Sequence, residues 1–188
     1  IIMRKKPGYK TCKKHKIFDN LLKQNFEVNE KNKVWCTDFT YMRQPNGKFR
    51  YNCSIIDLFD RSAVASVNDN YINTELAIKT LKLALKSENP SKGLILHSDQ
   101  GVQFASWEFV MFCKEHGVTQ SMSKAGCPYD NAPMERFYNT FKNCFYYRFA
   151  FDSVEKLDEM TKEYINWYNY VRPHSYNNYS TPMEVRFN

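Results

Sequence analysis

The sequence predicts a mixed α/β domain with an antiparallel portion, and two observations support this class. Alternating runs of apolar and polar residues, rich in aromatic and β-branched side chains, lie close together over residues 33–68 with only short turns between them. From residue 74 onward, segments with helical spacing of apolar residues alternate with short apolar runs. Strands followed by alternating helices and strands are typical of a mixed α/β domain.

Three strands are expected first, over residues 33–41, 48–58 and 61–68. The turn-forming tripeptide Pro45-Asn46-Gly47 separates the first two strands, and Phe59-Asp60 separates the next two. Connections this short join neighbouring strands in opposite directions, so the three strands are predicted to form an antiparallel meander.

Helices and short strands then alternate. The pattern predicts a helix over 74–86, a strand over 92–97, a helix over 104–116, a strand over 118–122, a loop over 123–131, a helix from about 132 and a helix over 154–170. Gly117 suits the end of a helix. Thr181 and Glu184 form the capping-box pattern of a last short helix. We therefore expect one domain over residues 33–188.

Positive charge is concentrated near the start of the chain, where residues 1–32 are polar and rich in lysine. Residues 1–33 carry ten lysines and arginines against three acidic residues, whereas the remaining 155 residues hold seventeen of each sign. A basic arm joined to a neutral domain is common in nucleic-acid-binding proteins, and it makes Lys13 and Lys14 candidate DNA contacts. A solvated terminus with no such role is the alternative.

The cysteines argue against a zinc-finger or disulfide-stabilised protein, and the apolar runs argue against a membrane protein. None of the six cysteines forms a CxxC pair or lies at zinc-finger spacing from a histidine, and no secretory signal precedes them. We therefore expect reduced, mostly buried thiols in a cytosolic protein. The apolar runs are far shorter than the roughly 20 residues that cross a bilayer, so a membrane role is not supported.

Two aspartates are placed where α/β sheets carry chemistry. Asp38 lies in the middle of the first strand, where an unpaired carboxylate costs free energy unless it is hydrated, paired or bound to a metal. Asp99 follows the apolar strand at 92–97, and the carboxyl end of a strand is a common place for a functional group. Gly101, two residues further on, would let a ligand or another backbone segment approach closely.

A third acid, Glu135, lies in the first turn of the helix that Asn131 and Pro133 open. Each acid alone has a structural interpretation, such as capping or an interaction with a helix dipole. Three carboxylates that converge from three elements, however, make an oxygen-rich site suited to two Mg²⁺ or Mn²⁺ ions. Such a pair of ions can activate an attacking oxygen and stabilise the leaving oxygen in phosphodiester chemistry.

The motifs around these acids closely resemble the transposases of the insertion-sequence family numbered three, which are related to retroviral integrases. Thirty-five residues separate Asp99 from Glu135, and the resemblance covers about residues 15–187. The matching segments are WCTD at 35–38, HSDQGVQ at 97–103, SKAGCPYDNAPME at 123–135, Lys142, YNYVRPH at 168–174 and STP at 180–182. Phe104 departs from this pattern, because a tyrosine is often seen there.

The resemblance implies an RNase H-like fold with a mixed five-stranded sheet flanked by helices. It also implies a DNA transposase that uses two divalent ions, with Asp38, Asp99 and Glu135 as catalytic and metal-binding residues. The enzyme would cut phosphodiester bonds at transposon ends and transfer the 3′-OH to another DNA site, as a homo-oligomer on DNA in the bacterial cytoplasm at the nucleoid. The helix-turn-helix region that recognises element ends is missing here and is expected upstream in the full-length product.

Six more residues are candidate DNA contacts. They are Lys124, Asn131, Arg136, Lys142, Arg172 and His174. Lys142 lies two helical turns beyond Glu135 on the same face, where it would hold a phosphate. Asn131 serves equally as a helix cap, and Arg172 and His174 serve equally as residues that end the last helix. His97 is either a hydrogen-bond partner of a ligand carboxylate or a core histidine with satisfied hydrogen bonds.

Two other functions remain open from the sequence. One is a nuclease on the same scaffold, which would cut DNA without joining strands. The other is a truncated or relic transposase that binds DNA, or a full-length partner, and regulates transposition without catalysis. The three intact acids favour catalysis over the relic.

Overall fold

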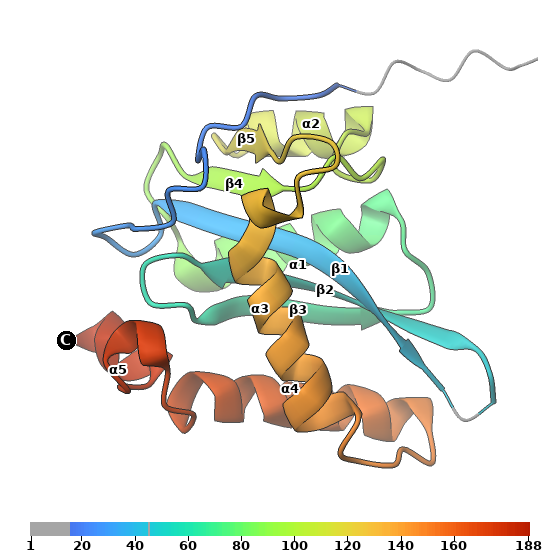
Figure 1. Ribbon diagram of the computed structural model, residues 1–188. Coiled ribbons are helices and arrows are strands. Elements are labelled where there is room, and N and C mark those ends of the chain that lie inside the picture. The colour runs from blue at the N-terminus through green and yellow to red at the C-terminus, as the bar shows by residue number, and fades with distance from the viewer. Residues whose placement is uncertain (1–15, 45) are drawn as a thin grey trace, which may run out of the picture.

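The computed structural model describes residues 16–44 and 46–188, which form a five-stranded sheet with helices on both faces (Figure 1). The strands are β1 (Val34–Arg43), β2 (Phe49–Asp57), β3 (Ala63–Asp69), β4 (Ile95–Ser98) and β5 (Thr119–Met122). Their order across the sheet is β3-β2-β1-β4-β5. Strands β1 to β3 are antiparallel neighbours, whereas β4 and β5 run parallel to β1. The predicted mixed sheet with its three-stranded antiparallel portion is confirmed.

The helices connect and cover these strands. The α-helices are α1 (Thr74–Glu88), α2 (Trp107–Glu115), α3 (Ala132–Phe141), α4 (Val154–Tyr170) and α5 (Pro182–Phe187). Three short turns accompany them: the 3₁₀ turns η1 (Pro128–Asn131) and η3 (Ser175–Asn177), and the π-helical turn η2 (Lys142–Tyr146). No helix in the described part of the chain is long and apolar enough to span a membrane.

Local chemistry explains where several elements begin. The helix predicted over 104–116 begins only at Trp107, because the Ser106 side chain accepts a hydrogen bond from the Phe109 amide and caps the helix there. The strand predicted over 92–97 begins only at Ile95, because Gly93 has a left-handed backbone with φ of 96°. The predicted capping box at the start of α5 is confirmed.

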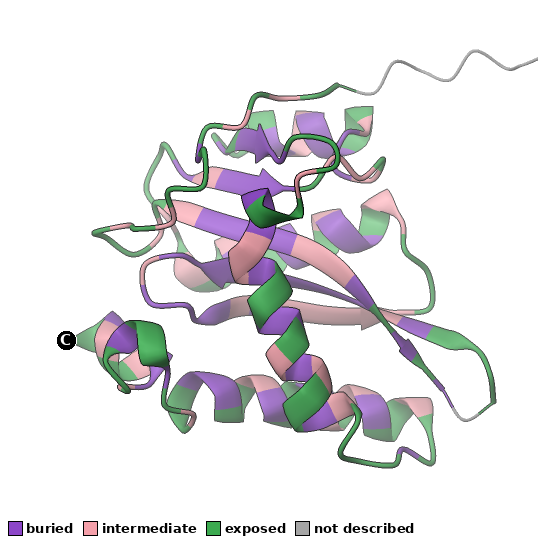
Figure 2. Cartoon of the chain, viewed as in Figure 1, coloured by how far each residue is buried: buried purple, intermediate pink, exposed green. Residues whose placement is uncertain are grey.

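The two faces of the sheet bury separate apolar layers. Trp35 packs in the layer beneath α1 and α2, whereas its neighbour Cys36 packs in the layer beneath α3 and α4. Side chains of a strand alternate between its two faces, so β1 contributes to both layers. The burial colours in Figure 2 show that α3 covers one of these layers, because one side of the helix is buried and the other side is exposed.

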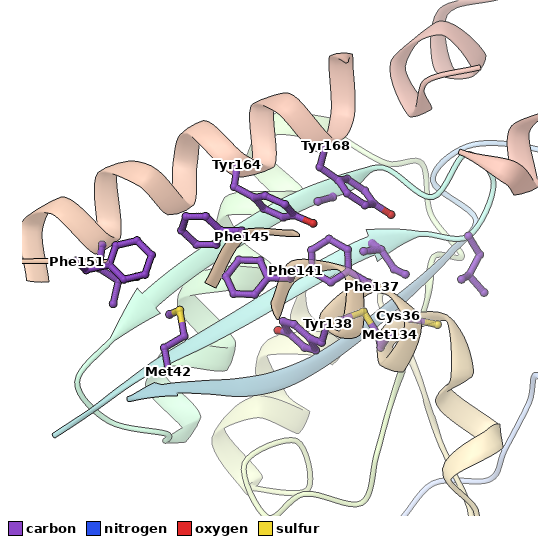
Figure 3. Close-up of a cluster of buried hydrophobic side chains, with 14 of the residues drawn as sticks. Cys36, Met42, Met134, Phe137, Tyr138, Phe141, Phe145, Phe151, Tyr164 and Tyr168 are labelled. Carbon is purple, nitrogen blue, oxygen red and sulfur yellow. The ribbon is translucent and has the colours of Figure 1, made fainter. Parts of the chain in front are cut away.

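Aromatic side chains join α3 to α4 over the sheet (Figure 3). The ring centroids of Phe137 and Tyr168 are 5.1 Å apart, and those of Phe141 and Tyr164 are also 5.1 Å apart, both in edge-on geometry. Aromatic pairs in this geometry stabilise beyond their buried area by about 0.5–1.5 kcal/mol each. The packing fixes the angle at which α3 crosses the sheet, and with it the position of the helix's first turn.

The cysteine predictions are confirmed in part. Cys36, Cys53 and Cys113 are free and buried, as expected. Cys144 is exposed, although mostly buried thiols were expected. The reason is that α3 passes into the π-helical turn η2 at Lys142, which changes the rotation of the side chains around the helix axis.

A buried cluster of charges anchors the last helix. The Arg186 guanidinium of α5 donates to Asp57 at 3.1 Å and to Asp60 at 2.5 Å, and it also pairs with Glu88 at the end of α1. Both aspartates are fully buried. This arginine therefore supplies the positive charge that lets two carboxylates lie inside the protein.

Replacing Arg186 by methionine should destabilise the fold strongly, because Asp57 and Asp60 would stay buried without a cation. The expected loss in the free energy of unfolding is roughly 3–5 kcal/mol, measured by chemical denaturation. Lys156→Gln is the control, since it breaks the exposed pair of Lys156 with Glu159 and should leave stability unchanged. Equal effects of the two substitutions would contradict the anchoring role.

Candidate active site

One open cavity of about 470 Å³ has all three predicted acids in its wall. Asp38 comes from β1, Asp99 from the segment after β4, and Glu135 from the first turn of α3. Lys124 and Asn131, two of the predicted DNA contacts, line the same cavity. The structure therefore brings together residues that lie up to about a hundred positions apart in the sequence.

The parallel pairing of β1 with β4 explains why the two aspartates meet. Cys36 of β1 is the register partner of His97 of β4. Asp38 lies two residues beyond Cys36 within β1, and Asp99 lies two residues beyond His97, directly after the end of β4. The two aspartates therefore come side by side where β4 ends, and both line the cavity there.

Asp38 is a partly buried carboxylate in a negative environment. Its Oδ1 accepts a hydrogen bond of 2.7 Å from the Phe39 amide. Burial, followed by the charges of Asp99 and Glu135, raises the pKa of Asp38 to about 7, against the opposing effect of the Phe39 amide. The ionised form is therefore costly here unless a cation comes close.

Asp99 depends on the glycine that follows it. The Gly101 amide donates to Asp99 Oδ1 at 2.9 Å, and a Cβ atom at Gly101 would lie only 2.9 Å from that same oxygen. The close neighbour of Gly101 is thus the Asp99 carboxylate itself, and the approach of a ligand or another backbone segment stays a prediction. Asp99 and Glu135 are both exposed to solvent in the cavity.

Tyr138 is a residue of this site that the sequence interpretation missed. Its hydroxyl donates to the main-chain carbonyl of Asp38 at 2.7 Å and accepts from the Ser54 amide at 2.9 Å. Tyr138 therefore bonds α3 to β1 at the residue that carries the first acid. Its place one helical turn after Glu135 is the signal that could have identified it.

Asn131 does not cap α3, so the predicted capping role is wrong. The 3₁₀ turn η1 runs directly into the helix, and the Ala132 amide is already bonded to the Tyr129 carbonyl. The Asn131 side chain instead donates to the Thr37 carbonyl of β1 at 3.3 Å. Asn131 is 5% exposed, and its Oδ1 finds no hydrogen-bond partner within residues 16–44 and 46–188.

The other predicted contacts lie at different distances from the acids. Lys124 is exposed in the cavity wall, and its amide donates to Asp130 at 2.9 Å. Lys142 is outside the lining, with its Nζ 4.6 Å from the centre of the Tyr41 ring. Lys13 and Lys14 lie outside the described residues.

Arg136 and His174 are not in the acid cavity but line a second one, and Arg172 stacks its guanidinium 5.6 Å from the Tyr168 ring centre. His97 is fully buried, and its two ring nitrogens bond to Ser121 and Ser123. Of its two interpretations, the core histidine with satisfied hydrogen bonds is confirmed.

The three acids do not converge on a single point. Within the described residues, no group of three or more His, Cys, Asp or Glu side chains is placed to hold one metal ion. Asp38 nevertheless lies close enough to both other acids for their charges to shift its pKa.

The fold defines the class of protein. The catalytic core domain of HTLV-2 integrase, solved with magnesium in a trimeric form, superposes with a TM-score of 0.66 over 84% of this chain and 97% of that chain, at 16% identity. A sheet of order β3-β2-β1-β4-β5 with helices on both faces is accordingly an RNase H-like fold. The predicted fold is confirmed.

The chain belongs to the integrase core domain family, which it matches over residues 28–128, and a second integrase core domain family matches residues 116–182. An insertion element IS600 protein of Shigella sonnei is 36% identical over 83% of this chain and 57% of its own length. The putative transposase InsK of IS150 from Escherichia coli is 34% identical over 89% and 59%. The resemblance to insertion-sequence transposases is confirmed, and the chain spans less than two thirds of these relatives.

Stability should fall with rising pH because of Asp38. A carboxyl group whose pKa is higher in the folded than in the unfolded chain loses its contribution as pH rises from about 4 through about 7. Asp38→Asn should flatten this part of the curve of unfolding free energy against pH, and Asp99→Asn should move it to lower pH. Denaturant titrations across this range test both, and a parent-like curve for Asp38→Asn would contradict the assignment.

Proposed function

We propose that this chain is the catalytic core of a DNA transposase, a polynucleotidyl transferase that cuts phosphodiester bonds at transposon ends and transfers the 3′-OH to another DNA site. The observation that carries the proposal is the meeting of Asp38, Asp99 and Glu135 around one open cavity. Membership of the integrase core domain family supports the same chemistry.

The donor set of the cavity fits divalent cations. Carboxylate oxygens are the ligands that Mg²⁺ and Mn²⁺ prefer, and two of these cations would neutralise the field that raises the pKa of Asp38. Asp38 and Asp99 would hold one ion, and Asp38 with Glu135 the other. When bound, the ions supply charge stabilisation to the attacking and leaving oxygens.

The remaining side chains position DNA and the acids. Lys124 and Lys142 would hold phosphates near the cavity, and Asn131 lies in the cavity wall. Tyr138 holds the backbone of Asp38 through its hydroxyl. The basic arm with Lys13 would add salt-dependent affinity along the DNA backbone.

Both steps are displacements at phosphorus. In the first, water adds its oxygen to the phosphorus and the 3′-oxygen leaves with a proton, which frees a 3′-OH. In the second, that hydroxyl attacks a phosphodiester of another DNA and a new 3′-oxygen leaves. No covalent bond to the protein forms. As in the insertion-sequence transposases that the chain resembles, we expect the partner to be DNA. We also expect a homo-oligomer to bind it, in the bacterial cytoplasm at the nucleoid.

Mg²⁺ should stabilise the folded protein through the acids. Because the cation favours ionised carboxylates, the expected rise in melting temperature on adding Mg²⁺ grows as pH rises through about 7. Asp38→Asn should abolish most of this rise, since both proposed ions share that residue. A rise that is equal in the parent and the variant would place the bound ion elsewhere.

Strand transfer can be tested in reverse, with a branched DNA that mimics the joined product, incubated with the protein and Mn²⁺. The parent should reseal the target strand, and Glu135→Gln should lower the rate by at least about 10²-fold, since several kcal/mol of charge stabilisation are lost. Glu155→Gln, in the first turn of α4, is the matched control and should retain the parent rate.

Two outcomes would redirect the proposal. Cutting without resealing would favour a nuclease on this fold. A folded protein that binds the branched DNA and does neither would favour the regulatory relic.

A further inference from the structure

A second cavity, of about 180 Å³, lies on the other side of the first turn of α3. Its polar wall is formed by Arg61 from the turn between β2 and β3, Arg136 from α3, and His174 from the segment after α4. Thr140 and several aromatic and aliphatic side chains complete the wall, and no carboxylate of the described residues contributes to it. The volume is below the roughly 300–1,000 Å³ typical of small-molecule pockets, so a small group fits best.

Arg61 is buried without a countercharge. It is 8% exposed, its Nη2 donates to the Phe26 carbonyl at 2.9 Å, and its guanidinium stacks 3.9 Å from the centre of the Tyr176 ring. Its Nη1 has no hydrogen-bond partner in the part of the chain that the structure describes. A buried charged donor left unpaired is costly, so a bound acceptor would stabilise it.

The other buried arginines show how unusual this is. Arg50 pairs with Asp158, and Arg186 pairs with three carboxylates. Arg61, by contrast, forms no ion pair among residues 16–44 and 46–188, and neither does the exposed Arg136 of the same cavity. The chain thus neutralises two of its three buried arginines internally and leaves Arg61 available for an external anion.

The surroundings reinforce the positive field. Burial, followed by the charges of Arg172, Arg61 and Arg136, lowers the pKa of His174 to about 4. His174 is therefore neutral near pH 7, and its Nδ1 accepts the Tyr176 amide at 3.3 Å. The three arginine charges that add to this effect of burial would also attract a negatively charged group.

We propose that this cavity binds a backbone phosphate of the DNA strand, held by Arg61 and Arg136. The inference rests on the proposed function, and it adds a site beyond the acid cavity. Glu135 lines the acid cavity and the next residue, Arg136, lines this second cavity. The two sites therefore lie on either side of a single helical turn. A DNA strand repeats its phosphates about every 3.4 Å of helix axis, so a strand cut at the acids offers further phosphates nearby.

The test uses the branched DNA without divalent metal and measures binding by fluorescence anisotropy. Single phosphates are replaced in turn by neutral methylphosphonates. One position should weaken binding by the parent roughly tenfold, and the same replacement should have no effect on Arg61→Met or Arg136→Gln. Each variant should also lower the slope of log affinity against log salt by about 0.9.

The control is Lys82→Gln, which removes one charge from the exposed side of α1 on the opposite face of the sheet. It should change neither the salt slope nor the methylphosphonate profile. Circular dichroism checks the fold of Arg61→Met. Because Arg136 is exposed, Arg136→Gln keeps the test decisive even if Arg61→Met unfolds.

Four results would overturn the proposal. The first is that no methylphosphonate position loses its effect in the variants, or that Lys82→Gln acts like them. The second is that the arginine variants keep the methylphosphonate profile of the parent but change their oligomeric state in sedimentation. This result would assign the cavity to an acidic side chain of a second copy. The third is a parent that does not bind DNA, which would reject the proposed function as well. Normal DNA binding and resealing by Arg136→Gln would reject the phosphate site alone.

Discussion

The parallel pairing of β1 with β4 is the constraint on which the site depends. Because Cys36 and His97 are register partners, the two strands bring Asp38 and Asp99 side by side where β4 ends. Sixty residues separate the two aspartates in the sequence. The antiparallel pairing of β1 with β2 on the other side makes β1 a central strand. A central strand is held along its length, so an acid in its middle is fixed in position.

Helix α3 adds the third acid through its packing. Aromatic contacts with α4 fix the helix over the sheet, and the Tyr138 hydroxyl bonds it to the backbone of Asp38. The first turn of α3 then separates two cavities of opposite character. One contains Asp38 together with the negative charges of Asp99 and Glu135, and the other contains Arg61 and Arg136 without a carboxylate in its described lining.

Local patterns predicted the elements well because periodicity reflects burial on one face of a strand or helix. The helix over 154–170 and the capping box at Thr181 have the predicted bounds and form. The failures occur where a neighbouring element changes the local outcome. Asn131 loses its capping role because η1 already satisfies the helix amides, and Cys144 turns outward because η2 alters the helical register.

The sequence by itself determined the order of strands and helices, the identity of the three acids as candidates and the resemblance to insertion-sequence transposases. These follow from residue type and spacing along the chain. Only the tertiary structure decided which charges are neutralised: Arg186 meets Asp57 and Asp60 across more than 120 positions, whereas Arg61 meets no acid among the described residues. Such pairings depend on how segments far apart in the sequence pack against each other, and a local sequence pattern does not predict this packing.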